Sequence, residues 1–251
     1  MKIAVTGATG FVGSRLIEQL QAQGHTAIAL TRNAERGRTA FPSPAFPNVT
    51  VVEYNPMQLG DWAQALAECD GVVNLAGEPI AEQRWTDSVK ATILNSRKVS
   101  TENLVAAIAQ VNPKPAVLVN ASAIGYYGTS ETATFDEQNS SGNDFLASVC
   151  EAWETAAKQV NTADTRLVIL RIGIVLGNGG ALGKMLTPFR MFAGGPIGSG
   201  RQWFSWIHRD DLVNLIIKGL TDTSMSGIYN ATAPNPVRMG ELCDRLGEVM
   251  N

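Results

Sequence analysis

Three glycines at three-residue intervals, Gly7, Gly10 and Gly13, constrain the fold of this chain more than any other feature. An apolar run, Ile3 to Val5, ends just before the first glycine, and residues 14–20 after the third carry leucine and isoleucine at helical spacing. A strand, a glycine turn and a helix in this order predict a dinucleotide-binding site. The first glycine permits a tight turn, the second lets a pyrophosphate approach the backbone, and the third lets the helix pack against the strand.

Such a spacing also occurs in plain strand–helix turns, but the units that follow favour the cofactor site. Strand and helix signals alternate along the chain at the spacing of βαβ units. Apolar runs such as Ala116–Val119 and Leu167–Leu170 are typical of parallel strands that are covered on both faces. We predict strands over 2–6, 26–31, 50–54, 71–75, 116–121 and 166–172, and helices near 12–23, 59–68, 86–111 and 142–162. These elements predict an α/β protein with a Rossmann-type, doubly wound parallel sheet.

Two stretches depart from this alternation. Three prolines within residues 34–48 predict a surface loop beside the cofactor, because proline interrupts a long helix. After residue 178, glycine-rich loops surround predicted helices at 182–192, 209–221 and 237–250 and a short strand at 227–231. We therefore expect a dinucleotide-binding domain over 1–178 and a smaller substrate-side region over 179–251, interleaved with the sheet domain.

Composition excludes several classes of function. The formal net charge is −3 without a long basic run, which argues against binding of nucleic acid. No apolar run approaches the roughly 18 residues that span a membrane. Two histidines, His25 and His208, are too far apart for a histidine-based metal site. Three scattered cysteines and the lack of a signal peptide predict a reducing, cytoplasmic location.

The end of the second predicted strand indicates which nicotinamide cofactor would bind. An NAD site usually offers an acidic residue to the ribose at this position, but the chain has Thr31 and Arg32. A carboxylate would repel a 2′-phosphate, whereas an arginine fork can bind it through two hydrogen bonds. We therefore predict NADP(H) rather than NAD; a solvated loop arginine is the alternative. Arg36 and Arg38 follow and could add positive charge.

Several long motifs resemble those of the extended short-chain dehydrogenases/reductases. They are Thr6–Gly13, Asn74–Gly77, Asn120–Gly128, Leu170–Gly177 and Trp206–Leu212. More narrowly, Leu75–Ile80, Arg84–Trp85, Ser122–Gly128, Phe145–Ala147 and Trp153–Glu154 resemble an atypical NAD-dependent epimerase/dehydratase-like subgroup. That subgroup occurs in bacteria and in plastids, where a member is linked to organelle division. The resemblance implies a plastid stroma location if the source is a plant. Members usually continue beyond the position of Asn251, so the resemblance implies that the C-terminal region is incomplete.

The glycine turn, the second strand and the resemblance together predict the cofactor contacts. They are Gly7, Thr9, Gly10, Phe11, Val12, Gly13, Thr31, Arg32, Leu75, Ala76, Gly77, Glu78, Ala121 and Ser122. Glu78 and Arg84 follow the fourth strand on a loop that should face the cleft, although a solvated loop explains them equally well.

The chain departs from the wider family at the residues of catalysis. The family uses a Ser or Thr, a Tyr, and a Lys four residues after that Tyr, which lowers the pKa of the Tyr and holds the ribose. When the motifs are aligned on Glu154, the Tyr position falls on Leu146 and the Lys position on Cys150; aligned on Tyr127–Gly128, the hydroxyl position falls on Ala123. The usual set is therefore absent.

Ser122, Tyr126 and Tyr127 are the candidate catalytic substitutes. Ser122 ends the fifth strand, and the two tyrosines follow on the next loop. The carboxyl ends of the strands are where α/β proteins place their sites. Packing and turn formation explain the tyrosines equally well.

Two further charged groups have simple structural explanations. Arg171 lies in an apolar strand, so we predict a structural ion pair first and a cofactor contact second. Asp210 or Asp211 would cap the helix that follows His208.

Two functions remain open at this point. The first is an NADP-dependent oxidoreductase or epimerase that acts on a small hydroxyl or carbonyl compound. The second is a regulatory protein that keeps the cofactor site, has lost proton transfer and binds a partner involved in cell or plastid division. A homodimer through helices 86–111 and 142–162 is implied only by analogy with the resembled family.

Overall fold

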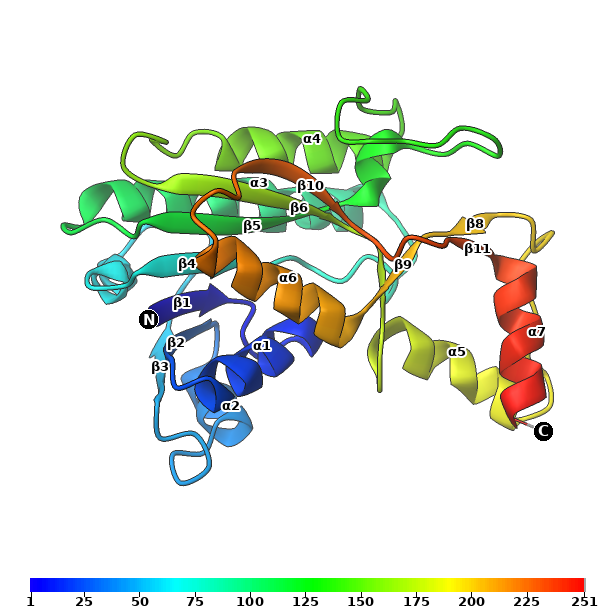
Figure 1. The fold of residues 1–251 in the computed structure, drawn as a ribbon, viewed down its shortest axis with the longest axis horizontal. Coiled ribbons are helices and arrows are strands. Elements are labelled where there is room, and N and C mark those ends of the chain that lie inside the picture. Colours follow the sequence, from blue (N-terminus) through cyan, green and yellow to red (C-terminus); the bar gives the residue numbers. More distant parts are fainter. Residues whose placement is uncertain (251) are drawn as a thin grey trace.

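A seven-stranded parallel sheet forms the centre of the protein, in a computed structural model that describes residues 1–250. Its strand order is β3–β2–β1–β4–β5–β6–β10 (Figure 1). The strands are β1 (Lys2–Thr6), β2 (Thr26–Thr31), β3 (Val49–Glu53), β4 (Gly71–Asn74), β5 (Val117–Ala123), β6 (Arg166–Ile172) and β10 (Gly227–Ala231). The doubly wound parallel class is confirmed, and the six strands predicted for the sheet domain agree with these bounds to within two residues.

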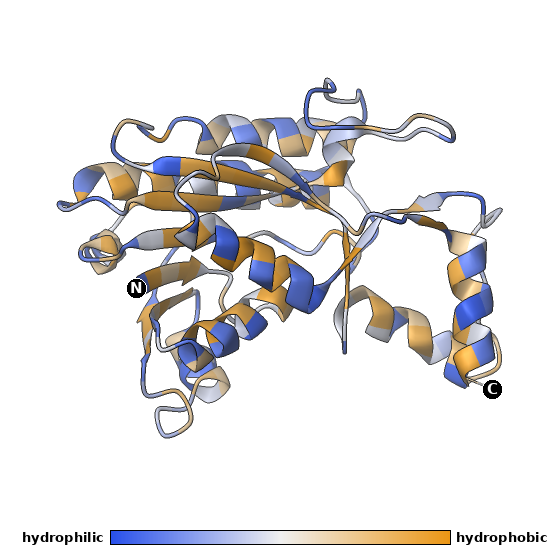
Figure 2. Ribbon diagram, viewed as in Figure 1, coloured by the Kyte–Doolittle hydropathy of each residue, from blue (hydrophilic) through white to orange (hydrophobic). Residues whose placement is uncertain are grey.

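Helices cover both faces of the sheet (Figure 1). On one face, α1 (Phe11–Ala22) and α6 (Arg209–Thr221) bury leucine and isoleucine against the strands. On the other face, α3 (Asp87–Gln110) buries leucine and isoleucine, and α4 (Phe145–Ala157) buries alanine, valine and tryptophan. The strands are predominantly hydrophobic and the helices carry hydrophilic residues (Figure 2). The inner strands β1, β2, β4, β5 and β6 are buried on both sides, whereas the edge strands β3 and β10 are only partly buried.

Two predicted elements differ from the structure. The predicted loop 34–48 begins with a short helix, α2 (Ala34–Ala40), because the first proline comes only at Pro42. The helix predicted at 59–68 is instead the 3₁₀ segment η1 (Asp61–Leu66). Glu68, with a φ of 66°, ends the helical path.

The part after residue 173 leaves the sheet and then returns to it. It forms β7 (Ile174–Leu176) paired with β9 (Trp206–His208), β8 (Trp203–Phe204) paired with β11 (Val237–Arg238), and the helices α5 (Gly180–Arg190) and α7 (Met239–Met250). The helices α5 and α7 lie to one side of the sheet, near the C-terminal end (Figure 1). Through α6 and β10 the chain then rejoins the sheet beside β6. The division at residue 178 stays a prediction.

The strand order reverses between β1 and β4. From β1 the chain builds outward through β2 and β3, and from β4 it builds in the opposite direction. In open α/β sheets, ligands bind at the carboxyl ends of the strands on either side of such a reversal. The segments that follow Thr6 and Asn74 are therefore where a ligand is expected to bind.

Candidate functional site

The three N-terminal glycines form a turn in which side chains have no room. Gly7 has a φ of +66°, and a Cβ there would lie 2.9 Å from the carbonyl carbon of Leu75. A Cβ on Gly13 would lie 2.2 Å from the Gly7 oxygen. Gly10 precedes α1 and caps it without a side chain. The first N–H groups of α1 therefore have no capping side chain, and no side chain of the turn covers them. This is the arrangement that accepts a pyrophosphate.

The hydroxyl of Thr6 joins the end of β1 to the end of β4, on either side of the point where the strand order reverses. Its Oγ1 donates a hydrogen bond to Asn74 Oδ1 (2.7 Å) and accepts from the backbone N–H groups of Leu75 (3.1 Å) and Ala76 (3.2 Å). The amide of Asn74 donates in turn to Asn120 Oδ1 (2.7 Å). The sequence patterns assign no role to Thr6; the available signal is a hydroxyl directly after the apolar run Ile3–Val5.

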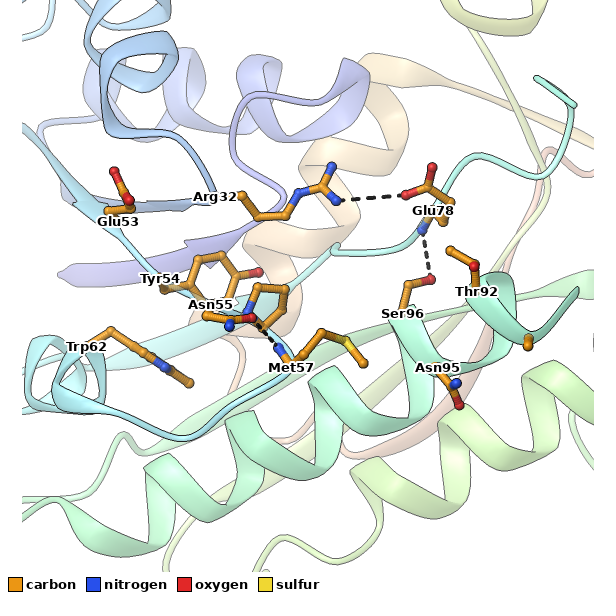
Figure 3. Close-up of a pocket in the computed structure, with 12 residues that line it drawn as sticks. Arg32, Glu53, Tyr54, Asn55, Met57, Trp62, Glu78, Thr92, Asn95 and Ser96 are labelled. Carbon is orange, nitrogen blue, oxygen red and sulfur yellow. Dashed lines mark hydrogen bonds and ion pairs between the residues drawn. The ribbon is translucent and has the colours of Figure 1, made fainter. Parts of the chain in front are cut away.

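A cavity of about 830 Å³ opens beside this crevice. It lies between the carboxyl ends of β2 and β3 and the first half of α3 (Figure 3). Its size falls in the range of small-molecule sites. The residues that line it are Arg32, Glu53, Tyr54, Asn55, Pro56, Met57, Trp62, Glu78, Ala91, Thr92, Asn95 and Ser96. Only Arg32 and Glu78 among them had been predicted as site residues.

Arg32 and Glu78 lie on opposite sides of the cavity and point toward each other (Figure 3). Arg32 Nη1 is 3.8 Å from Glu78 Oε2, and the arginine side chain is 75% exposed. The backbone N–H of Glu78 donates to Ser96 Oγ (3.0 Å). An ion pair this long and exposed is weak, so the guanidinium is available to another anion.

The other predicted cofactor contacts lie around the same crevice. Thr9, Phe11 and Val12 form the turn and the start of α1, and Thr31 ends β2 with its side chain largely buried. Leu75, Ala76 and Gly77 follow β4 directly, and Ala121 is buried in β5. Arg36 and Arg38 are exposed on α2.

A buried hydrogen-bond network occupies the ends of β5 and β6. Arg171 donates to both carboxylate oxygens of Glu154, at 2.8 and 3.0 Å, and to the Tyr127 hydroxyl at 2.9 Å. Ser122 Oγ donates to Glu154 Oε1 (2.8 Å), and the Tyr127 hydroxyl donates to Asn230 Oδ1 (2.7 Å). The structural ion pair predicted for Arg171 is confirmed.

The members of this network satisfy one another. Burial alone would lower the pKa of Arg171, but its hydrogen bonds to Glu154 and Tyr127 raise that pKa above the ordinary value. Burial raises the pKa of the Tyr127 phenol, against the opposing effect of Arg171. Ser122 is 2% exposed. Both hydroxyls therefore donate to protein acceptors rather than toward a ligand.

Tyr126 differs from the other two candidates. Its ring lies against the Arg171 guanidinium, with 3.4 Å between the guanidinium carbon and the ring centroid. The side chain is half-buried, and within residues 1–250 its hydroxyl makes no hydrogen bond. Among Ser122, Tyr126 and Tyr127, Tyr126 alone has an oxygen without a protein partner.

The positions of the missing Tyr and Lys hold apolar packing. A Cβ on Gly125 would lie 3.4 Å from Leu146 Cβ and 3.9 Å from Cys150 Sγ, so both side chains pack beneath η2 (Ile124–Tyr127). Burial raises the pKa of the Cys150 thiol to about 11. At neutral pH Cys150 is therefore a neutral thiol that neither carries the charge of a lysine nor acts as a nucleophile.

The predicted carboxylate cap of α6 is wrong. The capping residue is His208, whose Nδ1 accepts from the backbone N–H of Asp210 (3.2 Å). Asp210 instead forms an ion pair with Arg15 on α1, at 2.8 Å between Oδ1 and Nε. Asp211 lies in the first turn of the helix. The carboxylates were assigned to the cap because they are commoner there than histidine.

Residues 1–250 provide neither a membrane-spanning helix nor a cluster of metal ligands. Residues 1–250 contain no helix with the length and apolar character needed to cross a membrane. The same residues bring no three His, Cys, Asp or Glu side chains together in a way that could hold a metal ion.

Comparison with known proteins places this geometry in context. Residues 3–231 match the NAD dependent epimerase/dehydratase family. The chain is 48% identical to an epimerase family protein SDR39U1 homolog, chloroplastic, of Arabidopsis thaliana, over all of the chain and 71% of the relative. It is 39% identical to the epimerase family protein YfhF of Bacillus subtilis, over 99% of the chain and 80% of the relative. A crystal structure of human SDR39U1 (isoform 2) with NADPH superposes with a TM-score of 0.87 at 34% identity, covering 100% of this chain and 80% of that one.

Proposed function

This chain belongs to the NAD dependent epimerase/dehydratase family, and from that premise we propose that it binds NADP(H) in the crevice between β1 and β4. We further propose that it acts as an oxidoreductase or epimerase on a small hydroxyl or carbonyl compound. The observation that carries the proposal is the glycine turn, where a Cβ at Gly7 or Gly13 would collide with backbone atoms and where the first N–H groups of α1 lie open. The human relative crystallised with NADPH supports the choice of cofactor.

The residues around the crevice fit the parts of such a cofactor. The turn from Gly7 to Gly13 would hold the pyrophosphate, and the cavity lined by Tyr54–Met57 and α3 would hold the adenine. Arg32 would leave Glu78 and pair with the 2′-phosphate, because a phosphate offers two charged acceptors in place of one distant carboxylate. When bound, the cofactor supplies or accepts hydride at its nicotinamide ring.

Tyr126 is the best candidate to move a proton to or from the substrate oxygen. It lies just past the carboxyl end of β5, and its hydroxyl lacks a partner within residues 1–250. The Arg171 guanidinium lies against its ring, with 3.4 Å between the guanidinium carbon and the ring centroid, and fixes the orientation of the phenol. Ser122 and Tyr127 would then serve to hold Glu154, Arg171 and the loop in place.

A cofactor-binding regulatory protein is the second candidate function. It is favoured by Cys150, which stands where the family pattern requires a lysine and remains a neutral thiol at physiological pH. In this case NADP(H) would be a structural or sensed ligand, and a protein partner would recognise the occupied form.

Cofactor binding and turnover together test both candidates. We expect NADPH to bind with a change in its fluorescence, and a panel of small carbonyl compounds to include substrates that consume its absorbance. Tyr126→Phe should then lower turnover by about a hundredfold or more while leaving NADPH affinity unchanged. Tyr127→Phe is the matched control, and should instead lower the melting temperature because Arg171 and Asn230 lose a hydrogen-bond partner.

Each candidate has an outcome that removes it. Failure to bind NADPH would overturn the cofactor assignment. Binding without turnover across the panel would favour the regulatory protein over the enzyme. If turnover is found and Tyr126→Phe retains all of it, Tyr126 is not the proton donor.

A further inference from the structure

Arg97, in the middle of α3, places its guanidinium directly beneath Gly77 at the carboxyl end of the sheet. A Cβ on Gly77 would lie 3.0 Å from the Arg97 guanidinium carbon and 3.1 Å from its Nη2. Gly77 belongs to the segment that follows β4 and borders the crevice. The absence of a side chain at Gly77 is therefore what leaves room for this cation at the edge of the site.

The guanidinium has few acceptors among residues 1–250. Its Nη1 donates to the carbonyl of Ile93 one turn earlier in α3, at 3.1 Å, and no carboxylate of these residues forms an ion pair with it. Its other face lies over the ring of Trp153 on α4, with 5.2 Å to the ring centroid. The indole N–H of Trp153 is itself buried without an acceptor. This seam between α3 and α4 thus holds more donors than acceptors.

The charge of Arg97 is also poorly compensated. Burial lowers the pKa of Arg97, and the nearest titratable groups that oppose this shift are Cys150 and Glu78. Cys150 is a neutral thiol, since burial raises its pKa to about 11. Glu78 is shared with Arg32 on the far side of the cavity. An arginine nevertheless stays protonated at neutral pH, so a cation faces the site without a dedicated counter-ion.

The topology indicates which part of a dinucleotide would meet this cation. Each half of a doubly wound sheet holds one nucleotide, on either side of the reversal between β1 and β4. Arg32 and the segment after β3 line one side of the cavity, and Glu78 and the first half of α3 line the other. Arg97 lies beneath the segment after β4 and against Trp153 of α4. Cys150, one turn before Trp153, packs beneath Gly125, which follows β5. That is the side of the second nucleotide, whose ribose hydroxyls are oxygen acceptors.

We propose that Arg97 binds the ribose hydroxyls of the nicotinamide half of the cofactor and supplies there the positive charge that α4 lacks at Cys150. This assignment rests on the proposed binding of NADP(H). Arg97 would then contact the cofactor from α3, whereas on α4 the position of the family's lysine holds the thiol of Cys150. It also gives Gly77 a specific role, since any larger residue would displace the guanidinium.

Two ligands separate the two halves of the site. NADPH contains the nicotinamide ribose, whereas adenosine 2′,5′-bisphosphate contains only the adenine half with its 2′-phosphate. In titrations of the full chain, Arg97→Met should weaken NADPH binding by about tenfold or more and change bisphosphate binding by less than about twofold. Arg97→Lys should recover part of the NADPH affinity because it keeps the charge. Lys98→Met, on the same helix but paired outward with Glu102, should change neither affinity.

The outcomes distinguish this assignment from the proposed function. If the unsubstituted protein binds both ligands and Arg97→Met weakens both equally or neither, the assignment of Arg97 is overturned while NADP(H) binding stands. If the unsubstituted protein binds neither ligand, the proposed function fails and this assignment fails with it. Should Arg97→Met not fold, Arg97→Gln, which keeps a polar side chain on Trp153, is judged by the same ratio of the two affinities.

Discussion

The two ends of the crevice treat their charged side chains in opposite ways. At the nucleotide end, Arg32 is 75% exposed and its nearest carboxylate oxygen, on Glu78, is 3.8 Å away. At the end formed by β5 and β6, Arg171 and Glu154 are each 1% exposed and 2.8 Å apart. Arg32, with one weak partner, can exchange that partner for a phosphate. Arg171 cannot, because it already donates four hydrogen bonds, two to Glu154, one to Tyr127 and one to the Glu137 carbonyl. A charged side chain is therefore available to a ligand when its hydrogen-bond donors lack close protein acceptors; its charge alone does not make it available.

Burial explains why the second end had to be satisfied internally. A charged side chain removed from water costs several kcal/mol unless a close counter-ion and hydrogen bonds offset it. Arg171 follows the apolar run Leu167–Leu170 in β6, and Glu154 from α4 is the group that meets it. The network therefore anchors α4 to the sheet.

The sharpest way to break this contrast is to remove the buried carboxylate. Glu154→Gln should leave Arg171 without a buried counter-ion and destabilise the fold by about 3–5 kcal/mol. For a chain of this length that corresponds to a fall of about 10 °C in melting temperature. Thermal unfolding followed by circular dichroism would measure it.

An exposed ion pair provides the matched control. Glu131 pairs with Arg201 at 3.6 Å, and both side chains are more than 70% exposed. Glu131→Gln should shift the melting temperature by about 1 °C or less. Equal shifts for Glu131→Gln and Glu154→Gln would show that the buried network stabilises the fold no more than an exposed ion pair does.

At the end of the crevice that contains Arg32, a substitution is expected to lower cofactor affinity rather than stability. Arg32→Met should weaken NADPH binding by about tenfold or more and leave NADH binding nearly unchanged, because only NADPH carries the 2′-phosphate. Titration of the two cofactors side by side measures the ratio. Arg190→Met on α5, remote from the cavity lining, is the control arginine. A proportionate loss for both cofactors would remove the 2′-phosphate role of Arg32.

The smallest effect concerns the ion pair between Asp210 and Arg15, which joins α6 to α1 outside both ends. The hydrogen bond from Arg15 lowers the pKa of Asp210, so the pair adds stability above the ordinary aspartate pKa of about 4 and loses it as the pH falls through the lowered value. Asp210→Asn should lower the melting temperature at pH 7 by about 1–2 °C. That difference should shrink toward zero at acidic pH. A difference that persists at low pH would assign the effect to something other than the charge.

The sequence predicted what local patterns determine. The apolar runs located the strands of the central sheet, and Gly7, Gly10 and Gly13 located the turn, because each depends on neighbours within a few residues. An isolated arginine in an apolar strand was enough to predict that Arg171 has a partner, but not that Glu154 is that partner.

Residues that depend on packing could not be predicted in this way. The cavity walls at Tyr54–Met57 and the guanidinium of Arg97 follow from how β3, α3 and α4 lie against one another. No local motif records those distances. For the same reason the sequence did not distinguish Ser122 and Tyr127, which the network engages, from Tyr126, which it leaves free.

The hydroxyl of Thr6 has a consequence for redesign of this protein. One oxygen ties the last residue of β1 to Asn74 and to two successive amides beyond it. Valine would match the shape of threonine but would leave the Ala76 N–H and Asn74 Oδ1 without this partner, and the Leu75 N–H would keep only the Thr6 carbonyl. A redesign that changes the nucleotide preference of this protein can therefore alter the exposed residues around the cleft, but should retain Thr6.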